Sequence, residues 1–148
     1  MVAGESGPVD APRILHASCV ALHGQGVLIT GKSGSGKSTL ALELMARGAM
    51  LVADDRTCLT ASADGLIATC PPALAGRIEA RGIGILAADC APAARVRLVV
   101  DLDVTETDRL PPRHQTRLAG IALPLLRRVN GPHFPAAILQ YLKGGRCA

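Results

Sequence analysis

The sequence predicts an α/β fold with a mixed, mainly parallel sheet and flanking helices. Three observations lead to this prediction. Residues 26–30 are apolar and rich in β-branched side chains, which is typical of a buried parallel strand. A glycine-rich loop follows, and residues 38–47 after it are mostly good helix formers. Further apolar runs at 49–53 and 96–102 supply two more buried strands.

The chain before the glycine loop predicts a hairpin. Residues 13–22 can form an extended strand, and residues 23–26 turn it back into the strand at 26–30. The first residues are small, polar and acidic, so we expect residues 1–12 to be a disordered lead-in without a signal peptide. Residues 13–148 have the length of a single domain.

The middle of the chain predicts a second hairpin. Asp64-Gly65 is a strong turn signal between the extended runs at 56–60 and 66–70. A short helical turn is expected at 72–75. Residues 77–86 are charged at first and then alternate between Gly and Ile, and we expect them to be extended.

The last third predicts a loop, a strand and a helix. Residues 105–115 are polar and should be an exposed loop. Residues 121–125 are expected to form an edge strand, because Pro124 cannot donate to a strand ladder. A closing helix at 135–142 has Pro at its first position and Gly144 past its end.

Composition narrows the class of ligand. The net charge of +4 suits phosphorylated ligands or an acidic partner, but no run of Lys and Arg indicates a nucleic-acid arm. Tyr141 and Phe134 are the only Tyr, Phe or Trp residues, so stacking on nucleic-acid bases is not expected. Five cysteines without a C-x-x-C pair favour reduced thiols, and no apolar stretch has the length of a membrane span. We therefore expect a cytoplasmic protein that binds neither nucleic acid nor membrane.

Residues 31–38 fit G-x-x-x-x-G-K-[ST], the phosphate-binding P-loop. Glycines let the backbone curl around an anion, and the following helix presents free N–H groups and a partial positive charge. An exposed Lys37 would reach the β and γ phosphates of ATP, and the Ser38 hydroxyl would bind Mg²⁺. The residues expected to bind the nucleotide are Gly31, Lys32, Ser33, Gly34, Ser35, Gly36, Lys37, Ser38 and Thr39.

Acidic residues follow the strand at 49–53. Asp54 and Asp55 stand where the carboxyl ends of parallel strands line the ligand crevice of an open sheet. Neighbouring residues of a strand point to opposite sides, so one carboxylate could face the metal and the other a reacting hydroxyl. A solvated acidic turn is the alternative. Glu79 is either a further Mg²⁺ ligand or half of a surface pair with Arg81.

At this point the sequence resembles a known family. His16-Ala17-Ser18, the strand and loop at 26–38, Leu51-Val52-Ala53-Asp54-Asp55 and Ile78-Glu79-Ala80-Arg81-Gly82-Ile83-Gly84-Ile85 occur in one order. Together they look like the catalytic, P-loop-containing kinase domain of HPr kinase/phosphorylase. The resemblance covers about residues 13–86, and the run from Ile78 to Ile85 is close to a family signature.

The resemblance implies an ATP-dependent serine kinase whose partner is HPr, the phosphocarrier protein of the sugar phosphotransferase system. The family also removes that phosphate with inorganic phosphate. By motif position, Asp55 would take the serine proton. The other implied residues are His16, Lys37 and Arg109 in the active site and Ser38 and Glu79 as magnesium ligands, beside Asp54 from the reasoning above.

Several positions depart from the family pattern. Thr39 stands where the family often has Glu, and residues 123–128 only faintly echo a family loop linked to dephosphorylation. These departures leave the kinase direction as the main expectation and weaken the reverse one. The resemblance also implies a homo-oligomer, by family habit a hexamer, built here from the catalytic domain alone.

Two other functions remain open at this point. A small-molecule P-loop kinase would need a lid with arginines, for which residues 111–117 are short. A regulator that senses nucleotide would bind ATP and leave every acceptor unmodified.

Overall fold

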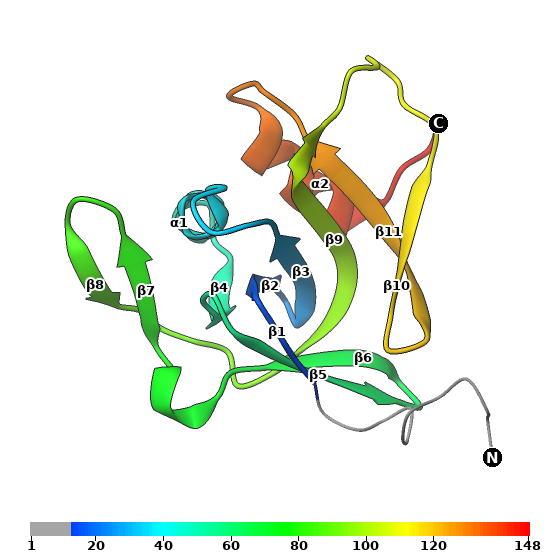
Figure 1. The fold of residues 1–148 in the computed structure, drawn as a ribbon. Helices are drawn as coiled ribbons and strands as arrows, with labels where there is room; N and C mark the ends of the chain where they lie inside the picture. Colours follow the sequence, from blue (N-terminus) through cyan, green and yellow to red (C-terminus); the bar gives the residue numbers. More distant parts are fainter. Residues whose placement is uncertain (1–12) are drawn as a thin grey trace.

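The computed structural model describes residues 13–148, and the predicted disordered segment 1–12 lies outside them. This part of the chain forms a nine-stranded mixed sheet, a separate two-stranded hairpin and two α-helices (Figure 1). The elements are β1 (Arg13–Leu15), β2 (Ala17–Leu22), β3 (Gln25–Thr30), α1 (Lys37–Ala46), β4 (Met50–Ala53), β5 (Thr57–Ser62), β6 (Gly65–Thr69), η1 (Pro72–Leu74), β7 (Arg77–Ala80), β8 (Gly84–Ala87), β9 (Ala94–Thr105), β10 (His114–Leu118), β11 (Ile121–Arg128) and α2 (Phe134–Gly144).

Strand β9 is the centre of the sheet. One of its edges pairs with β3 in parallel, and β2 and β4 continue the sheet beyond β3. Its other edge pairs first with β6, at Ala94 and Arg95, and then with β11, from Val99 onward. The sheet therefore forks at β9, and β5 and β1 follow β6 on one branch while β10 follows β11 on the other.

The expectation of a mainly parallel sheet is wrong. Only the pairs β3–β9 and β9–β11 are parallel among residues 13–148, and the other pairs of the large sheet are antiparallel. The reason lies in the turns. Residues 23–24 adopt positive φ values of 52° and 79°, which make the tight β2–β3 hairpin. Tight turns can join only antiparallel neighbours, and the β5–β6 hairpin predicted from Asp64-Gly65 is another such pair.

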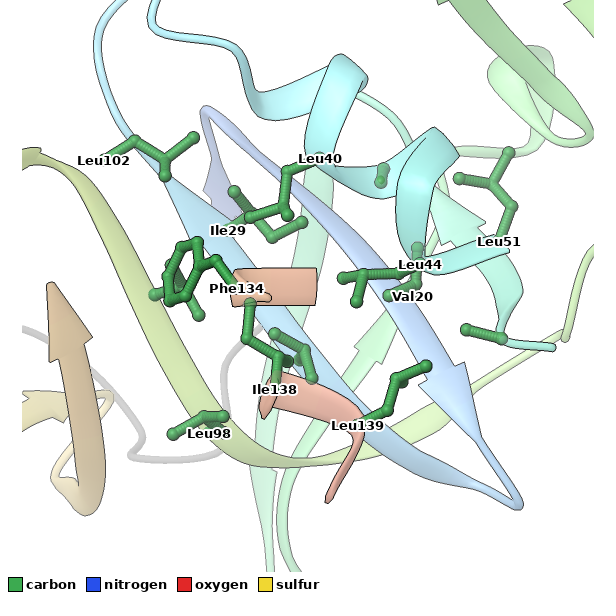
Figure 2. Packing of buried hydrophobic residues seen from close by; sticks show 14 of the residues in the cluster. Val20, Ile29, Leu40, Leu44, Leu51, Leu98, Leu102, Phe134, Ile138 and Leu139 are labelled. Atoms are coloured by element: carbon green, nitrogen blue, oxygen red, sulfur yellow. The ribbon is translucent and has the colours of Figure 1, made fainter. Parts of the chain in front are cut away.

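Both helices pack on the same face of the sheet, so they do not flank it from two sides. Figure 2 shows Leu40 and Leu44 of α1 and Ile138 of α2 meeting over Val20 and Ile29 of the sheet. All five side chains are buried. The large apolar residues of this face are the driving force for docking both helices, because each fully buried side chain contributes about 1.5–3 kcal/mol.

The opposite face of the sheet is covered by strands. Leu28 of β3 and Val99 of β9 belong to a second buried cluster with Leu59 of β5, Leu66 of β6 and Leu123 of β11. The two branches of the sheet thus close over the face that the helices leave open. Strands β2 and β3 are buried on both faces, which explains their nearly continuous apolar sequences.

Glycine ends α1 as the sequence predicts. Gly48 has a φ of 109°, its N–H donates to Met45 O at 3.1 Å, and the N–H of Ala49 donates to Leu44 O at 3.1 Å. This is the Schellman pattern that satisfies the last carbonyls of a helix. The closing helix α2 is also confirmed, and it includes Gly144 as its last residue.

Strand β10 is not foreseen from the sequence, and β11 is not an edge strand. β11 lies between β9 and β10, and its parallel pairing with β9 begins at Leu125, directly after Pro124. The proline therefore precedes the ladder with β9 rather than marking a sheet edge. Residues 106–113 remain without strand or helix, as expected for part of the predicted loop. Neither helix of residues 13–148 has the length and apolar character to cross a membrane.

The helix-covered core yields a stability prediction. Leu44 of α1 is fully buried against the sheet, whereas Leu110 is 74% exposed. We expect Leu44→Ala to lower the free energy of unfolding by about 2–5 kcal/mol, because it removes buried methyl groups and leaves a cavity. Leu110→Ala is the matched control and should change it by less than about 0.5 kcal/mol. Urea unfolding of both variants measures this, and equal losses would contradict the packing described here.

Candidate functional site

The glycine loop, residues 31–38, connects the carboxyl end of β3 to the first turn of α1. Gly34 and Gly36 have φ values of 83° and 102°, a region that other residues rarely adopt. At Gly31 the limit is space, because a Cβ there would lie 2.4 Å from Ser35 Oγ. The sequence motif is thus explained by backbone curvature at two glycines and by close packing at a third.

A cavity of about 380 Å³ opens in front of the glycine loop. It brings together the three clusters that the sequence singled out, namely the loop, the two neighbouring aspartates and the Glu79–Arg81 segment. Its lining consists of Ser33, Gly34, Gly36, Lys37, Ser38, Thr39, Asp54, Asp55, Glu79 and Arg81. Gly31, Lys32 and Ser35 do not line it and belong to the structural part of the loop.

Ser35 lies inside the loop rather than in the cavity. Its N–H donates to Lys32 O at 3.0 Å, and its hydroxyl is buried without a hydrogen-bond partner. Ser35 is therefore part of the interior packing of the loop.

The expectation of an exposed Lys37 is wrong. The residue is only 6% exposed, and its Nζ donates to Gly31 O at 2.8 Å and to Lys32 O at 3.2 Å. The curled loop supplies these carbonyl acceptors, and the sequence motif alone does not show where they point. Lys37 still lines the cavity, and its ammonium group closes the loop beside it.

Asp54 is the most highly connected side chain at the cavity. Its Oδ1 accepts the Ser38 hydroxyl at 2.7 Å and the Ser18 hydroxyl at 2.8 Å, and its Oδ2 accepts the Glu79 N–H at 3.1 Å. Ser18 is fully buried, and its Oγ accepts the Asp55 N–H at 3.0 Å. The sequence reasoning gave Ser18 no role, although a lone serine in an apolar strand was a signal that could have been used.

Asp55 faces a different partner. Its Oδ1 lies 2.6 Å from His16 Nε2, and both side chains are about half exposed. Asp55 has a φ of 68°, a left-handed conformation that Asp tolerates better than most residues. β4 ends at Ala53, so this turn, not strand alternation, separates the two carboxylates. His16 does not line the cavity, but it contacts Asp55, which does.

The remaining predicted residues differ in whether they line the cavity. Glu79 on β7 and Arg81 in the following turn are exposed and line the cavity. Among the ion pairs of residues 13–148, none joins Glu79 to Arg81, so the alternative of a surface pair is not what the structure shows. Arg109 lies in the exposed segment between β9 and β10, away from the cavity lining.

Two residues contact the glycine loop from behind, and the sequence reasoning missed their role. Both oxygens of Asp103 accept the Lys32 N–H at 3.1 Å. Arg128 donates through Nη2 to Ser35 O and through Nε to Leu102 O, the latter at 3.0 Å. Both residues lie near the carboxyl ends of strands that run parallel to β3, a placement that depends on strand pairing and that no local sequence signal showed.

The cavity offers hard oxygen donors for a divalent cation. Ser38, Asp54 and Glu79 supply one hydroxyl and two carboxylates around it. Nowhere in residues 13–148 do three His, Cys, Asp or Glu side chains gather into a complete metal site. This partial set suits Mg²⁺, which typically takes one or two carboxylates and completes its shell with water and substrate phosphates.

The fold and cavity define an α/β protein whose glycine loop is suited to surround an anion at a helix N-terminus. Comparison with known proteins narrows this class. The family model of the HPr Serine kinase C-terminal domain matches residues 10–124, and the chain belongs to that family.

Individual relatives agree with the family. The HPr kinase/phosphorylase of Stenotrophomonas maltophilia (strain K279a) is 54% identical over 78 residues, which are 51% of this chain and 25% of that protein. The HPr kinase/phosphorylase of Xanthomonas campestris pv. campestris (strain B100) is 53% identical over the same length and shares. The chain thus matches about a quarter of the length of these relatives. The solved Hpr(Ser) kinase/phosphatase from Coxiella burnetii has a TM-score of 0.74 and 27% identity, covering 88% of both chains.

The buried Lys37 yields a prediction about stability. We expect Lys37→Ala to lower the free energy of unfolding by about 1–3 kcal/mol without any ligand, because two loop carbonyls lose a charged donor. Lys32→Ala is the matched control, since Lys32 is exposed and donates to the loop structure only through its backbone. Thermal unfolding compares the two variants, and a Lys37→Ala protein as stable as the control would show that the ammonium group has no structural role.

Proposed function

We propose that the protein is an ATP-dependent serine kinase that phosphorylates HPr in the cytoplasm. The observation that supports this best is the single cavity joining the glycine loop, Asp54, Asp55 and Glu79. Membership of the HPr Serine kinase C-terminal domain family and the names of the relatives support it as well. A homo-oligomer, by family habit a hexamer, is part of the proposal.

The glycine loop fits a nucleotide as a P-loop. A Cβ at Gly34 or Gly36 would meet nothing within 4 Å, so the backbone borders open space there. Amides that border open space at a helix N-terminus can donate to phosphate oxygens. Lys37 lines the same cavity and would add its positive charge. ATP, when bound, supplies the phosphoryl group that is transferred.

Mg²⁺ would be held by Ser38 and Glu79, with Asp54 as the carboxylate that organises both. Asp54 already binds the Ser38 hydroxyl and the Glu79 N–H, so it fixes the two residues relative to each other. Mg²⁺ contributes neutralisation of phosphate charge. The protein's own contribution here is placement of the ligands.

In this proposal Asp55 would accept the serine proton of the substrate. His16 contacts Oδ1 of Asp55, which fixes the orientation of the carboxylate and leaves Oδ2 directed elsewhere. Both side chains are about half exposed, as a site for a protein substrate requires. In the reverse reaction Asp55 would return the proton while inorganic phosphate takes up the phosphoryl group. A role for Arg109 toward the substrate stays a prediction.

The proposed activity is tested directly with HPr. We expect incubation with ATP and Mg²⁺ to add one phosphoryl group to a serine of HPr, as read from intact and peptide masses. An HPr with that serine replaced by alanine and a reaction with excess EDTA are the controls. A protein that binds ATP but leaves HPr unmodified would favour the nucleotide-sensing alternative, and phosphorylation of small metabolites alone would favour the small-molecule kinase.

Proton transfer by Asp55 and metal binding by Glu79 are separable in this proposal. We expect Asp55→Asn to slow phosphoryl transfer by about 10²–10⁴-fold, because a general base is lost, while nucleotide affinity stays within a few-fold. Glu79→Gln should instead raise the Mg²⁺ concentration needed for half-maximal rate. Asp64→Asn, in the exposed β5–β6 turn, is the control. Single-turnover kinetics with a Mg²⁺ titration decide this, and a normal transfer rate in Asp55→Asn would remove that residue from proton transfer.

A further inference from the structure

The glycine loop is held from behind by two charged side chains that do not line the cavity. We propose that Asp103 and Arg128 are positioning residues, which orient two peptide planes of the loop for phosphate binding. This inference rests on the proposed function, because it assigns the two residues to the nucleotide site of that function. Neither residue contacts the space in which the phosphates would lie.

Asp103 fixes the peptide plane between Gly31 and Lys32. Both carboxylate oxygens accept the Lys32 N–H at 3.1 Å, and the Asp103 backbone N–H is itself held by Asp101 Oδ1 at 2.8 Å. A trans peptide is planar, so its N–H and C=O point in opposite directions. Binding the Lys32 N–H on the outer side therefore turns the Gly31 carbonyl inward. Lys37 Nζ donates to that carbonyl at 2.8 Å. By orienting the Gly31 carbonyl, Asp103 therefore also positions the Lys37 ammonium group.

Arg128 fixes the peptide plane between Ser35 and Gly36. Its planar guanidinium bridges two acceptors, Leu102 O on β9 and Ser35 O in the loop. Drawing the Ser35 carbonyl toward β11 turns the N–H of Gly36 the opposite way. Gly36 lines the cavity and immediately precedes α1, so this N–H is directed at the anion site.

The sheet topology makes this support possible. β3, β9 and β11 lie side by side and run parallel, so their carboxyl ends meet at one edge. The glycine loop leaves the end of β3, Asp103 stands in the last part of β9, and Arg128 ends β11. A loop rich in glycine has many accessible conformations. Two contacts to a rigid sheet edge reduce that freedom before any ligand arrives.

The direction in which nucleotide affinity changes on removal of Asp103 distinguishes a positioning role from a purely electrostatic one. Asp103 carries a negative charge beside an anion site, so on Coulombic grounds alone its removal should tighten nucleotide binding. Positioning predicts the opposite result, because the Gly31 carbonyl and Lys37 would lose their orientation. For Arg128, the variant Arg128→Lys distinguishes the effect of charge from that of geometry. Lysine keeps the positive charge but lacks the planar guanidinium that donates to two carbonyls at once.

The test measures binding of Mg²⁺ and AMP-PNP, a non-hydrolysable ATP analogue, by isothermal titration calorimetry. We expect Asp103→Ala and Arg128→Gln to raise Kd by about tenfold, the size of one hydrogen bond. Arg128→Lys should recover only part of that loss. Asp64→Ala, an exposed acid in a distant turn, and Arg127→Gln, the neighbour that does not contact the loop, are the matched controls and should keep the wild-type Kd.

Hydrogen exchange on the unliganded proteins provides a second readout. Peptides covering residues 31–38 should exchange faster in Asp103→Ala than in Asp64→Ala, although melting temperatures stay similar. Should Arg128→Gln fail to fold, the exposed Asp103 still carries the test. A Kd in Asp103→Ala equal to or tighter than wild type, or full recovery in Arg128→Lys, would overturn the inference. Failure of the proposed function looks different, because the wild-type protein would then bind AMP-PNP normally and leave HPr unmodified.

Discussion

The carboxylate of Asp54 joins the parts of the chain on which the site depends. It accepts hydrogen bonds from β2 through Ser18, from α1 through Ser38 and from the β7 backbone at Glu79. These segments do not share one continuous ladder, and β7 belongs to a separate two-stranded hairpin. A single acid at the end of β4 thus brings the hairpin, the helix and the sheet to the same cavity. Its three contacts therefore fix the relative positions of β2, α1 and β7 at the cavity.

The glycine loop has two sides with different tasks. The front borders the cavity through Ser33, Gly34 and residues 36–39. The back contacts Asp103 and Arg128, which are fixed by the ends of two sheet strands. Between the sides lies Ser35, whose hydroxyl is buried without a partner. The Lys37 ammonium group closes the loop through its hydrogen bonds to Gly31 O and Lys32 O.

Sequence reasoning predicted what is decided locally. The strand, loop and helix at the glycine motif, the Gly48 helix end and the Asp64-Gly65 hairpin all follow from residues close together in the chain. The balance of parallel and antiparallel pairs was predicted wrongly, because only some of the antiparallel pairs are local hairpins. The pairs β1–β5, β2–β4 and β6–β9 are antiparallel and join segments that are distant in the sequence. The exposure of Lys37 was predicted wrongly for a related reason. Its acceptors are backbone carbonyls, and their orientation appears only once the loop is folded and held.

The support of the glycine loop has a consequence for the order of synthesis. Asp103 and Arg128 follow their partners Lys32 and Ser35 by 71 and 93 residues. A chain leaving the ribosome therefore presents the complete loop sequence long before the residues that hold its peptide planes. Ligands bound only by the folded state stabilise it by mass action. A ligand that binds only the supported loop can therefore stabilise the nascent chain only after β11 has emerged.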